Sequence, residues 1–470
     1  MKRHFQLVLF LNGILLFESI IISAANLKLK IIDSETGKPI PARVLIKNID
    51  GESFVLKNSV NLQIGKEIWF MSPGISEVNV TSDKIILRVE RGKEYMRVKK
   101  NIDLKKNSGK IEVVLKRWIH MKKRGYLSSE NHLHRDAEDV AAMCAAEDLD
   151  FGTSLQWWNY PRFGVPEGES NILEISCGSS TTPVTIFDVE VEESWGALYL
   201  INMPNPFPFL NDKKMPNLIA AEYGKKRNSL NCYQSGWSRE VLIDALLGYV
   251  DVVNVCNNNF HMHRYQPRSL YSNLLEVEAL PVYKNTPEGM MQMDTDTYYR
   301  LLNCGLKLAT GAGSATGAKE TPVGFNRTYV RSSSKDINKF FQAWRGGNNF
   351  VTNGPMLFLK TSDGLHPGDS LNISGSKKVK VEVEVISDSP LGSVEIVVNG
   401  KVVKSFPVEK GKKKFKGNYS VNISNSSWIC ARCTDTDMLL NDKEMEEYRS
   451  PRVHLFQDPN SAYKSDLFLR

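Results

Sequence analysis

The histidines are the residues of this chain best placed to do chemistry, because four of the eight lie in pairs spaced two residues apart. The pairs are His132 with His134 and His261 with His263, whereas eight randomly placed histidines would give on the order of 0.1 such pairs. Side chains two apart in an extended segment project to the same face. Each pair could therefore supply half of a divalent metal site. Ordinary buried or surface histidines are the alternative reading of both pairs.

The residues after the first pair predict the start of a helix. Asp136 suits the N-cap position, with Asp139 three residues further on. His134 would then lie in a strand-to-helix loop, where barrels carry their active sites. Four acidic residues are read as helix capping and solvent-facing charge, not as general bases: Glu138, Asp139, Glu147 and Asp148.

The second pair follows a predicted buried strand, Val252–Cys256, and would leave it at the ligand-bearing end of a barrel. Arg135 and Arg264 could each hold an anionic substrate group or pair with a nearby carboxylate. Trp157 and Trp158 could form the floor of a pocket that binds a ring or a sugar. Neighbours on a strand point to opposite faces, so only one of the two can do so.

A family resemblance rests on Ser129–Arg135, reading SENHLHR, and on Ala146–Phe151, reading AEDLDF. Together they resemble the opening of the PHP (polymerase and histidinol phosphatase) domain, and over about residues 118–365 the chain is most similar to the CehA/McbA branch of metallohydrolases. The resemblance implies a distorted (β/α)7 barrel. It also assigns a metal-ligand role to Glu190, which lies six residues before Gly196.

Other positions depart from the family pattern. Ala197 replaces a histidine, Trp157-Trp158-Asn159 replaces an Asp-His step, and Ala315 lies where an acidic ligand is expected. We therefore expect one ion, with zinc as the first choice and manganese or iron as alternatives. The expected ligands are His132, His134, Glu190 and either His261 or His263. For Glu190 the alternative is a solvent-facing acidic run with Asp188, Glu192 and Glu193.

Two functions are compatible with these residues. A bound ion would lower the pKa of its water toward about 7 and polarise an ester, phosphoester or carbamate-like bond of a small-molecule substrate. Because several family ligands are missing, an inactive barrel that binds a carbohydrate or another small molecule is the alternative. The glycine-rich segment Gly311–Gly317 lacks the Lys-Ser/Thr step of a phosphate loop, so nucleotide binding is not expected.

The elements that must position these residues divide the chain into an α/β part between two all-β parts. Residues 26–117 show short alternating runs that predict a β-sandwich, and Asp33–Leu45 resembles carboxypeptidase regulatory-like modules. Residues 118–366 mix helical stretches with short apolar strands, as expected of the barrel. Residues 367–470 return to alternation, with a hairpin at Asn399-Gly400, and predict a second β-sandwich.

The N-terminus and the charge set the expected location and partners. Residues 1–25 combine basic residues, an apolar stretch and a small-residue end, which predicts a cleaved signal peptide and an exported, periplasmic or extracellular protein. No later segment looks long and apolar enough to span a membrane. The formal charge of +7 is spread out, so no nucleic-acid partner is expected, and the basic run Lys410–Lys416 is read as a solvated hairpin. Seven scattered cysteines are read mostly as buried thiols. Cys430 and Cys433 form a lone CxxC, which favours a local disulfide or plain packing over a zinc ribbon.

Overall fold

The computed structural model describes residues 25–106, 109–158, 170–193, 196–208, 216–257, 287–435 and 467–469. Most of the predicted signal segment lies outside these ranges, as do His261, His263 and Arg264. Among the helices of the described ranges, none is both long enough and apolar enough to cross a bilayer.

The N-terminal part is built from two sheets over one apolar core. One sheet has the order β6-β1-β9 and the other β4-β5-β2-β7-β8, with β3 paired to β2. In β6 and β9 exposed and buried residues alternate strictly, as the sequence pattern predicts. The strands are β1 (Ala25–Asp33), β2 (Ala42–Asn48), β3 (Ser53–Phe54), β4 (Asn61–Ile64), β5 (Glu67–Ser72), β6 (Ile75–Val80), β7 (Lys84–Glu90), β8 (Val98–Asp103) and β9 (Lys110–Leu115).

The central part is a mixed sheet with helices. Its strand order is β11-β13-β14-β15-β16-β17, with β12 paired to β13. The strands are β11 (Gly152–Trp158), β12 (Ile172–Cys177), β13 (Ser180–Glu193), β14 (Gly196–Ile201), β15 (Leu230–Tyr233), β16 (Val252–Cys256) and β17 (Ala309–Ala312). The helices are α1 (Ala137–Ala146), α2 (Asn217–Lys226), α3 (Val241–Leu246), α4 (Pro287–Asn303) and α5 (Ile337–Arg345). Helices α1, α2 and α4 pack on one face, where alternate strand residues form a core with them.

The opposite face of this sheet holds a second core and the histidines. Phe340, Phe341 and Trp344 of α5 pack there against strand residues such as Tyr199 and Val252. The segment 128–134, which begins in β10 (Tyr126–Ser129), joins the two ends of the sheet. On one side Leu155 N donates to Leu133 O, and on the other Asn131 N donates to Ala312 O. This segment carries both His132 and His134.

The C-terminal strands continue the sheet that begins with β10. Its order is β10-β18-β19-β26-β25-β22-β23, and a smaller sheet has the order β20-β21-β24. The strands are β18 (Arg327–Arg331), β19 (Asn349–Thr352), β20 (Met356–Thr361), β21 (Lys377–Ile386), β22 (Leu391–Val398), β23 (Lys401–Phe406), β24 (Lys414–Ile423), β25 (Ile429–Asp435) and β26 (Leu467–Leu469). Strand β20, which precedes the boundary expected at residue 366, pairs with β21, which follows it.

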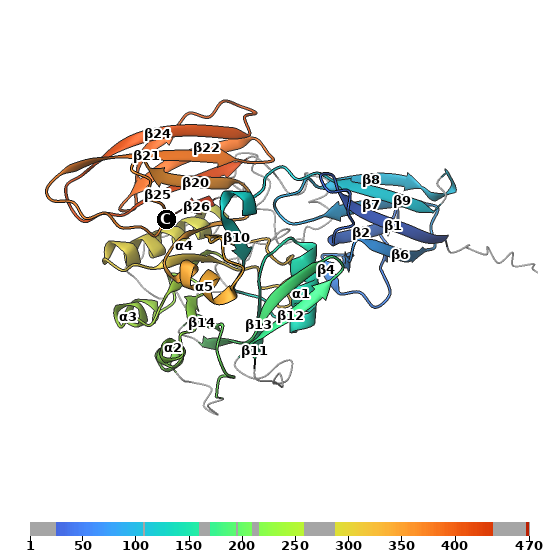
Figure 1. Ribbon diagram of the computed structural model, residues 1–470, viewed down its shortest axis with the longest axis horizontal. Helices are drawn as coiled ribbons and strands as arrows, with labels where there is room; N and C mark the ends of the chain where they lie inside the picture. The colour runs from blue at the N-terminus through green and yellow to red at the C-terminus, as the bar shows by residue number, and fades with distance from the viewer. Residues whose placement is uncertain are drawn as a thin grey trace, which may run out of the picture.

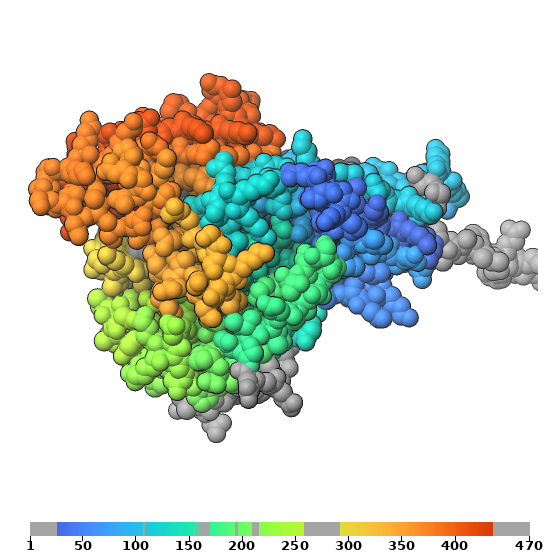
Figure 2. Space-filling model, in the orientation of Figure 1, coloured from blue at the N-terminus to red at the C-terminus, as the bar shows by residue number. Residues whose placement is uncertain are grey.

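Figures 1 and 2 show three parts in contact: the N-terminal strands at one end, the C-terminal strands above, and the helices below. The chain is thus multidomain and mixed α/β, as expected from its pattern. The hairpin at Asn399-Gly400 is confirmed, with φ of 50° and 81° as a type I′ turn requires. Asp136 caps α1 through Asp139 N at 2.8 Å, as predicted. Helix α2 was not foreseen; it begins after Pro216, without the side-chain cap that marks the start of α1.

All seven cysteines are free in the structure, and five of them are buried. Cys430 and Cys433 both lie in β25, with exposures of 2% and 1%. Cys430 packs in the core of the central part and Cys433 in the C-terminal core. This agrees with packing as the role of the pair. The basic run Lys410–Lys416 is largely exposed, as expected, but it is not a hairpin, because it connects β23 with β24, which lie in different sheets.

Candidate metal centre

His132, His134 and Glu190 form a buried cluster on the inner face of the central sheet. The two Nε2 atoms are 2.9 Å apart, and Glu190 Oε2 lies 3.0 Å from His134 Nε2 and 3.6 Å from His132 Nε2. All three residues are between 1% and 3% exposed. Among the residues that the structure describes, this is the one group of three or more His, Cys, Asp or Glu side chains that could share an ion.

Strand register brings Glu190 to this cluster. Glu190 pairs with Trp158 of β11 on one side and with Tyr199 of β14 on the other. Residues paired across neighbouring strands project to the same face, so all three side chains reach the histidines. The solvent-facing alternative for the acidic run is wrong for Asp188 and Glu190, which are buried. Asp188 accepts hydrogen bonds from Thr185 Oγ1 and Asn202 N, and Glu190 lies against the histidines.

The glycine-rich segment 311–317 packs directly beneath the histidines. A Cβ at Gly313 would lie 2.4 Å from His132 Cβ, and a Cβ at Gly317, where φ is +98°, would lie 2.1 Å from His134 O. His134 N also donates to Thr316 O at 2.8 Å. The glycines therefore let this segment approach the ligand-bearing backbone closely, which explains them without a bound nucleotide.

Two contacts of His132 were not predicted from the sequence. Its Nδ1 lies 2.9 Å from Tyr199 Oη and 3.1 Å from Asn257 Oδ1. Asn257 directly follows β16, so the strand end that was expected to lead to the second histidine pair does reach the first one. A polar residue at the end of a strongly apolar strand was the available signal for Asn257. Tyr199 lies inside the apolar run of β14 and had no such signal.

Trp158 is the tryptophan of the predicted pocket that contacts the cluster. Its ring centroid lies 4.7 Å from that of His134, and its Nε1 donates to Glu192 Oε2 at 2.6 Å. At this position an aromatic ring packs beside the ligands where the family pattern expects an Asp-His step. The Trp157 side chain lies outside the described part of the chain.

Burial and the neighbouring imidazoles determine the charge of Glu190. Burial alone would raise the pKa of Glu190, but its electrostatic interactions with the His132 and His134 side chains outweigh burial and lower this pKa to about 2. Burial, followed by the charge of Glu190, holds the pKa of Tyr199 well above its usual 10. The cluster therefore presents one carboxylate beside two imidazoles and a neutral phenol.

This donor set fits a divalent ion. Ligands about 2.0–2.2 Å from a tetrahedral zinc lie about 3.3 Å from one another, close to the three separations in the cluster. Glu190 Oε2 lies 3.0 Å from His134 Nε2 but has no hydrogen-bond partner that meets standard distance and angle criteria. A buried carboxylate oxygen without a donor is costly unless a cation satisfies it.

The remaining predicted residues lie at the margin of the cluster or outside the described chain. Arg135 pairs with Asp139 at 3.2 Å, which is the carboxylate-pairing alternative considered for it. His261, His263 and Arg264 fall outside the described residues, so their roles stay predictions. The solvent-facing reading of Glu147 and Asp148 is wrong: both are buried in ion pairs with Arg43, Arg91 and Arg117 of the N-terminal part or its linker.

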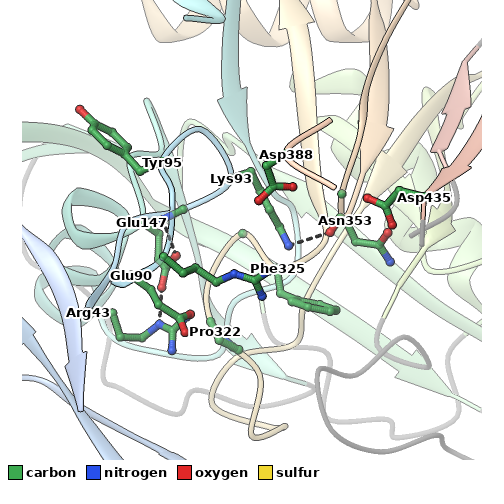
Figure 3. A pocket seen from close by; sticks show the side chains of 14 residues that line it. Arg43, Glu90, Lys93, Tyr95, Glu147, Pro322, Phe325, Asn353, Asp388 and Asp435 are labelled. Carbon is green, nitrogen blue, oxygen red and sulfur yellow. Dashed lines mark hydrogen bonds and ion pairs between the residues drawn. The ribbon is translucent and has the colours of Figure 1, made fainter. Parts of the chain in front are cut away.

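A separate pocket lies where the three parts meet, away from the cluster (Figure 3). In its wall Arg43 links Glu90 with Glu147, and Lys93 Nζ donates to Asn353 O at 2.7 Å. Asp388 and Asp435 line it from the C-terminal strands. The contacts of its lining residues join the parts of the chain to one another, so they support a structural role for this junction.

No family model and no curated protein sequence matches the chain. A similar solved structure is described as a two-domain protein containing a predicted PHP-like metal-dependent phosphoesterase, from Bacteroides vulgatus ATCC 8482. The similarity covers 66% of this chain and 91% of that chain, with 10% sequence identity and a TM-score of 0.29. At this TM-score the likeness supports no conclusion about this chain.

Proposed function

We propose that the chain is a metal-dependent hydrolase whose ion is held by His132, His134 and Glu190. The observation that carries the proposal is the convergence of two imidazole nitrogens and one carboxylate oxygen, 2.9 to 3.6 Å apart, in a buried site. Two histidines and one carboxylate are a common ligand set for catalytic zinc and for non-haem iron, and they leave a position for water. A fourth ligand from His261 or His263 belongs to this proposal.

When bound, such an ion supplies an activated water and polarises the scissile bond. The residues of the protein would then hold the ion and orient the substrate. Glu190 compensates the charge of the ion, Trp158 packs against His134, and Arg135 and Arg264 are the proposed contacts for an anionic substrate group. Trp157 and Trp158 are the proposed floor for a ring. The substrate class is a small molecule with an ester, phosphoester or carbamate-like bond.

The finer parts of the proposal concern family and location. The central sheet, joined end to end through segment 128–134, would be a distorted PHP-like barrel of the CehA/McbA type. The parts before and after it would be β-sandwich domains with boundaries near residues 117 and 366, and the chain would be exported after removal of residues 1–25. Zinc is the proposed ion, with manganese and iron as alternatives.

One observation favours the alternative of an inactive, ligand-binding barrel. Trp158 packs on His134 where a further ligand would be expected from the family pattern, so the ligand set within the described chain stops at three. A site of this kind could hold an ion for structure or for ligand binding without turnover.

The test is metal analysis of the full chain purified without chelator. We expect about one equivalent of a divalent metal in the natural protein and none in a His132→Ala/His134→Ala variant. A His120→Ala/His366→Ala variant is the matched control, because both of these histidines lie outside the cluster. Equal metal content in all three proteins would refute the proposal. Bound metal without hydrolysis of ester, phosphoester or carbamate panels would support the binding alternative.

A further inference from the structure

Asn257 is the residue outside the ligand set whose contacts bear most directly on the histidines. Its Oδ1 lies 3.1 Å from His132 Nδ1, the ring nitrogen that faces away from Glu190. The amide orientation is set by Nδ2, which donates to Gln234 O at 3.1 Å. The backbone oxygen of Asn257 is held separately, by Asn326 Nδ2. Asn257 is 3% exposed, so water does not compete for these contacts.

The orientation of the amide restricts the tautomer of His132. With Nδ2 directed at Gln234 O, the atom facing the ring is an oxygen, which can only accept a hydrogen bond. Tyr199 Oη, 2.9 Å from the same nitrogen, can donate or accept. If Nδ1 were unprotonated, its lone pair would face a lone pair of Asn257 Oδ1, and these two atoms are 3.1 Å apart. Only a proton on Nδ1 satisfies both neighbours.

We infer that Asn257, locked by the backbone of Gln234, is a positioning residue that holds the proton of His132 on Nδ1 and so presents the Nε2 lone pair to the cluster. The inference rests on the proposed function, since the lone pair matters because an ion would use it. Partners of this kind fix the orientation of a ligand histidine and raise its affinity for metal. Gly313 supports the arrangement, because a Cβ there would lie 2.4 Å from His132 Cβ and 3.1 Å from Asn257 Oδ1.

The first test needs neither metal nor substrate. The full chain, labelled with ¹⁵N-histidine and stripped of metal, is studied by long-range ¹H–¹⁵N correlation, and the His132 signals are assigned by their loss in His132→Gln. We expect a single Nδ1–H tautomer in the natural protein. A proton on Nε2, as donation from Tyr199 to Nδ1 would require, overturns the inference.

The second test compares variants at Asn257 and Tyr199. Asn257→Leu removes the acceptor at similar volume, Asn257→Asp keeps an acceptor oxygen, and Tyr199→Phe removes only the hydroxyl. We expect Asn257→Leu to lose the single tautomer and to bind Zn²⁺ about 10- to 100-fold more weakly by chelator competition. Tyr199→Phe should keep the tautomer, because the Asn257 acceptor remains. Asn257→Asp keeps an acceptor beside Nδ1 but loses the bond to Gln234 O, so its Zn²⁺ affinity should lie between those of Asn257→Leu and the natural protein. Retention of the tautomer in Asn257→Leu overturns the inference.

Failure of the proposed function would look different. If the natural protein bound no metal while showing the Nδ1–H tautomer, the metal site would be refuted and the hydrogen-bond assignment would stand. A metal-binding protein with the opposite tautomer would refute the role of Asn257 alone.

Discussion

Glu190 and Tyr199 lie directly opposite each other in the antiparallel pair β13–β14, and each contacts the histidine pair from a different side. Glu190 Oε2 reaches His134 Nε2 at 3.0 Å, and Tyr199 Oη reaches His132 Nδ1 at 2.9 Å. A single cross-strand pair thus supplies both a candidate ligand and a support for a second ligand. The positions of Glu190 and Tyr199 are therefore set by strand register, whereas the two histidines lie on the segment that follows β10.

The ligand role of Glu190 predicts a specific loss in Glu190→Gln, which keeps the shape of the side chain and removes its charge. We expect Zn²⁺ affinity, measured by chelator competition, to fall at least about 100-fold, because loss of an outer partner alone costs about 10- to 100-fold. Glu192→Gln is the matched control, because Glu192 accepts a hydrogen bond from Trp158 Nε1 and lies outside the three-residue cluster. Equal losses in the two variants would remove Glu190 from the ligand set.

Much of this arrangement could be predicted from local pattern. The spacing of His132 and His134, the cap at Asp136, the strand Val252–Cys256 and the turn at Asn399-Gly400 all depend on neighbouring residues, and the structure contains each of them. Glu190 was expected only through a family resemblance.

The features that could not be predicted from the sequence depend on contacts between distant segments. Tyr199 reads as one more apolar residue of a buried strand, and only its register with Glu190 brings its hydroxyl to His132. Glu147 and Asp148 look like exposed charges at a helix end, and only the position of the N-terminal part, which contributes Arg43 and Arg91, makes them buried. Register and domain packing are non-local, so periodicity cannot reveal them.

Close packing under the histidines predicts an effect of adding one methyl group at Gly317. In Gly317→Ala the new Cβ would lie 2.1 Å from His134 O, so the ligand-bearing backbone must move. Gly364→Ala is a matched control, because Gly364 has a similar φ of +86° but no atom within 4 Å of the added Cβ. We expect Gly364→Ala to cost about 1–2 kcal/mol from backbone strain alone.

Gly317→Ala should therefore cost more stability than its control in urea unfolding and should also weaken Zn²⁺ binding at least about tenfold, as displacement of a ligand support does. Equal unfolding free energies together with natural affinity in both variants would show that the approach of segment 311–317 does not hold the histidines.

The buried link between the N-terminal part and helix α1 predicts a large destabilisation in Arg43→Met. Arg43 contacts Glu147 at 2.5 Å and Glu90 at 2.7 Å. Its removal takes this ion-pair partner from the buried Glu147 and leaves Glu90 with its pair to Arg88. Breaking such a pair costs about 3–5 kcal/mol, measured as the free energy of unfolding in urea. Lys30→Met breaks an exposed pair with Glu112 and should cost at most about 1 kcal/mol. Similar values for the two variants would mean that the N-terminal part packs loosely against α1.

The same ion network predicts how stability changes in acid. Burial would raise the pKa of Glu90, but Arg43, Arg88 and Arg97 outweigh burial and lower it from 4.5 to about 2. A carboxyl whose pKa is lower in the folded state stabilises that state above its unfolded pKa, and this contribution is lost as the pH falls toward the folded value. Glu90 should thus contribute on the order of 3 kcal/mol above about pH 5 and progressively less between pH 5 and 2.

The check is the difference in unfolding free energy between the natural protein and Glu90→Gln, measured by urea titration at several pH values. Other carboxylates titrate in both proteins and largely cancel in the difference, so it should be constant above about pH 5 and shrink steadily as the pH falls. Glu112→Gln, at a half-exposed position in the N-terminal sheet, should show a small difference at every pH. If the difference in unfolding free energy between the natural protein and Glu90→Gln did not change between pH 5 and 2, the ion pairs of Glu90 with its arginines would not stabilise the folded state.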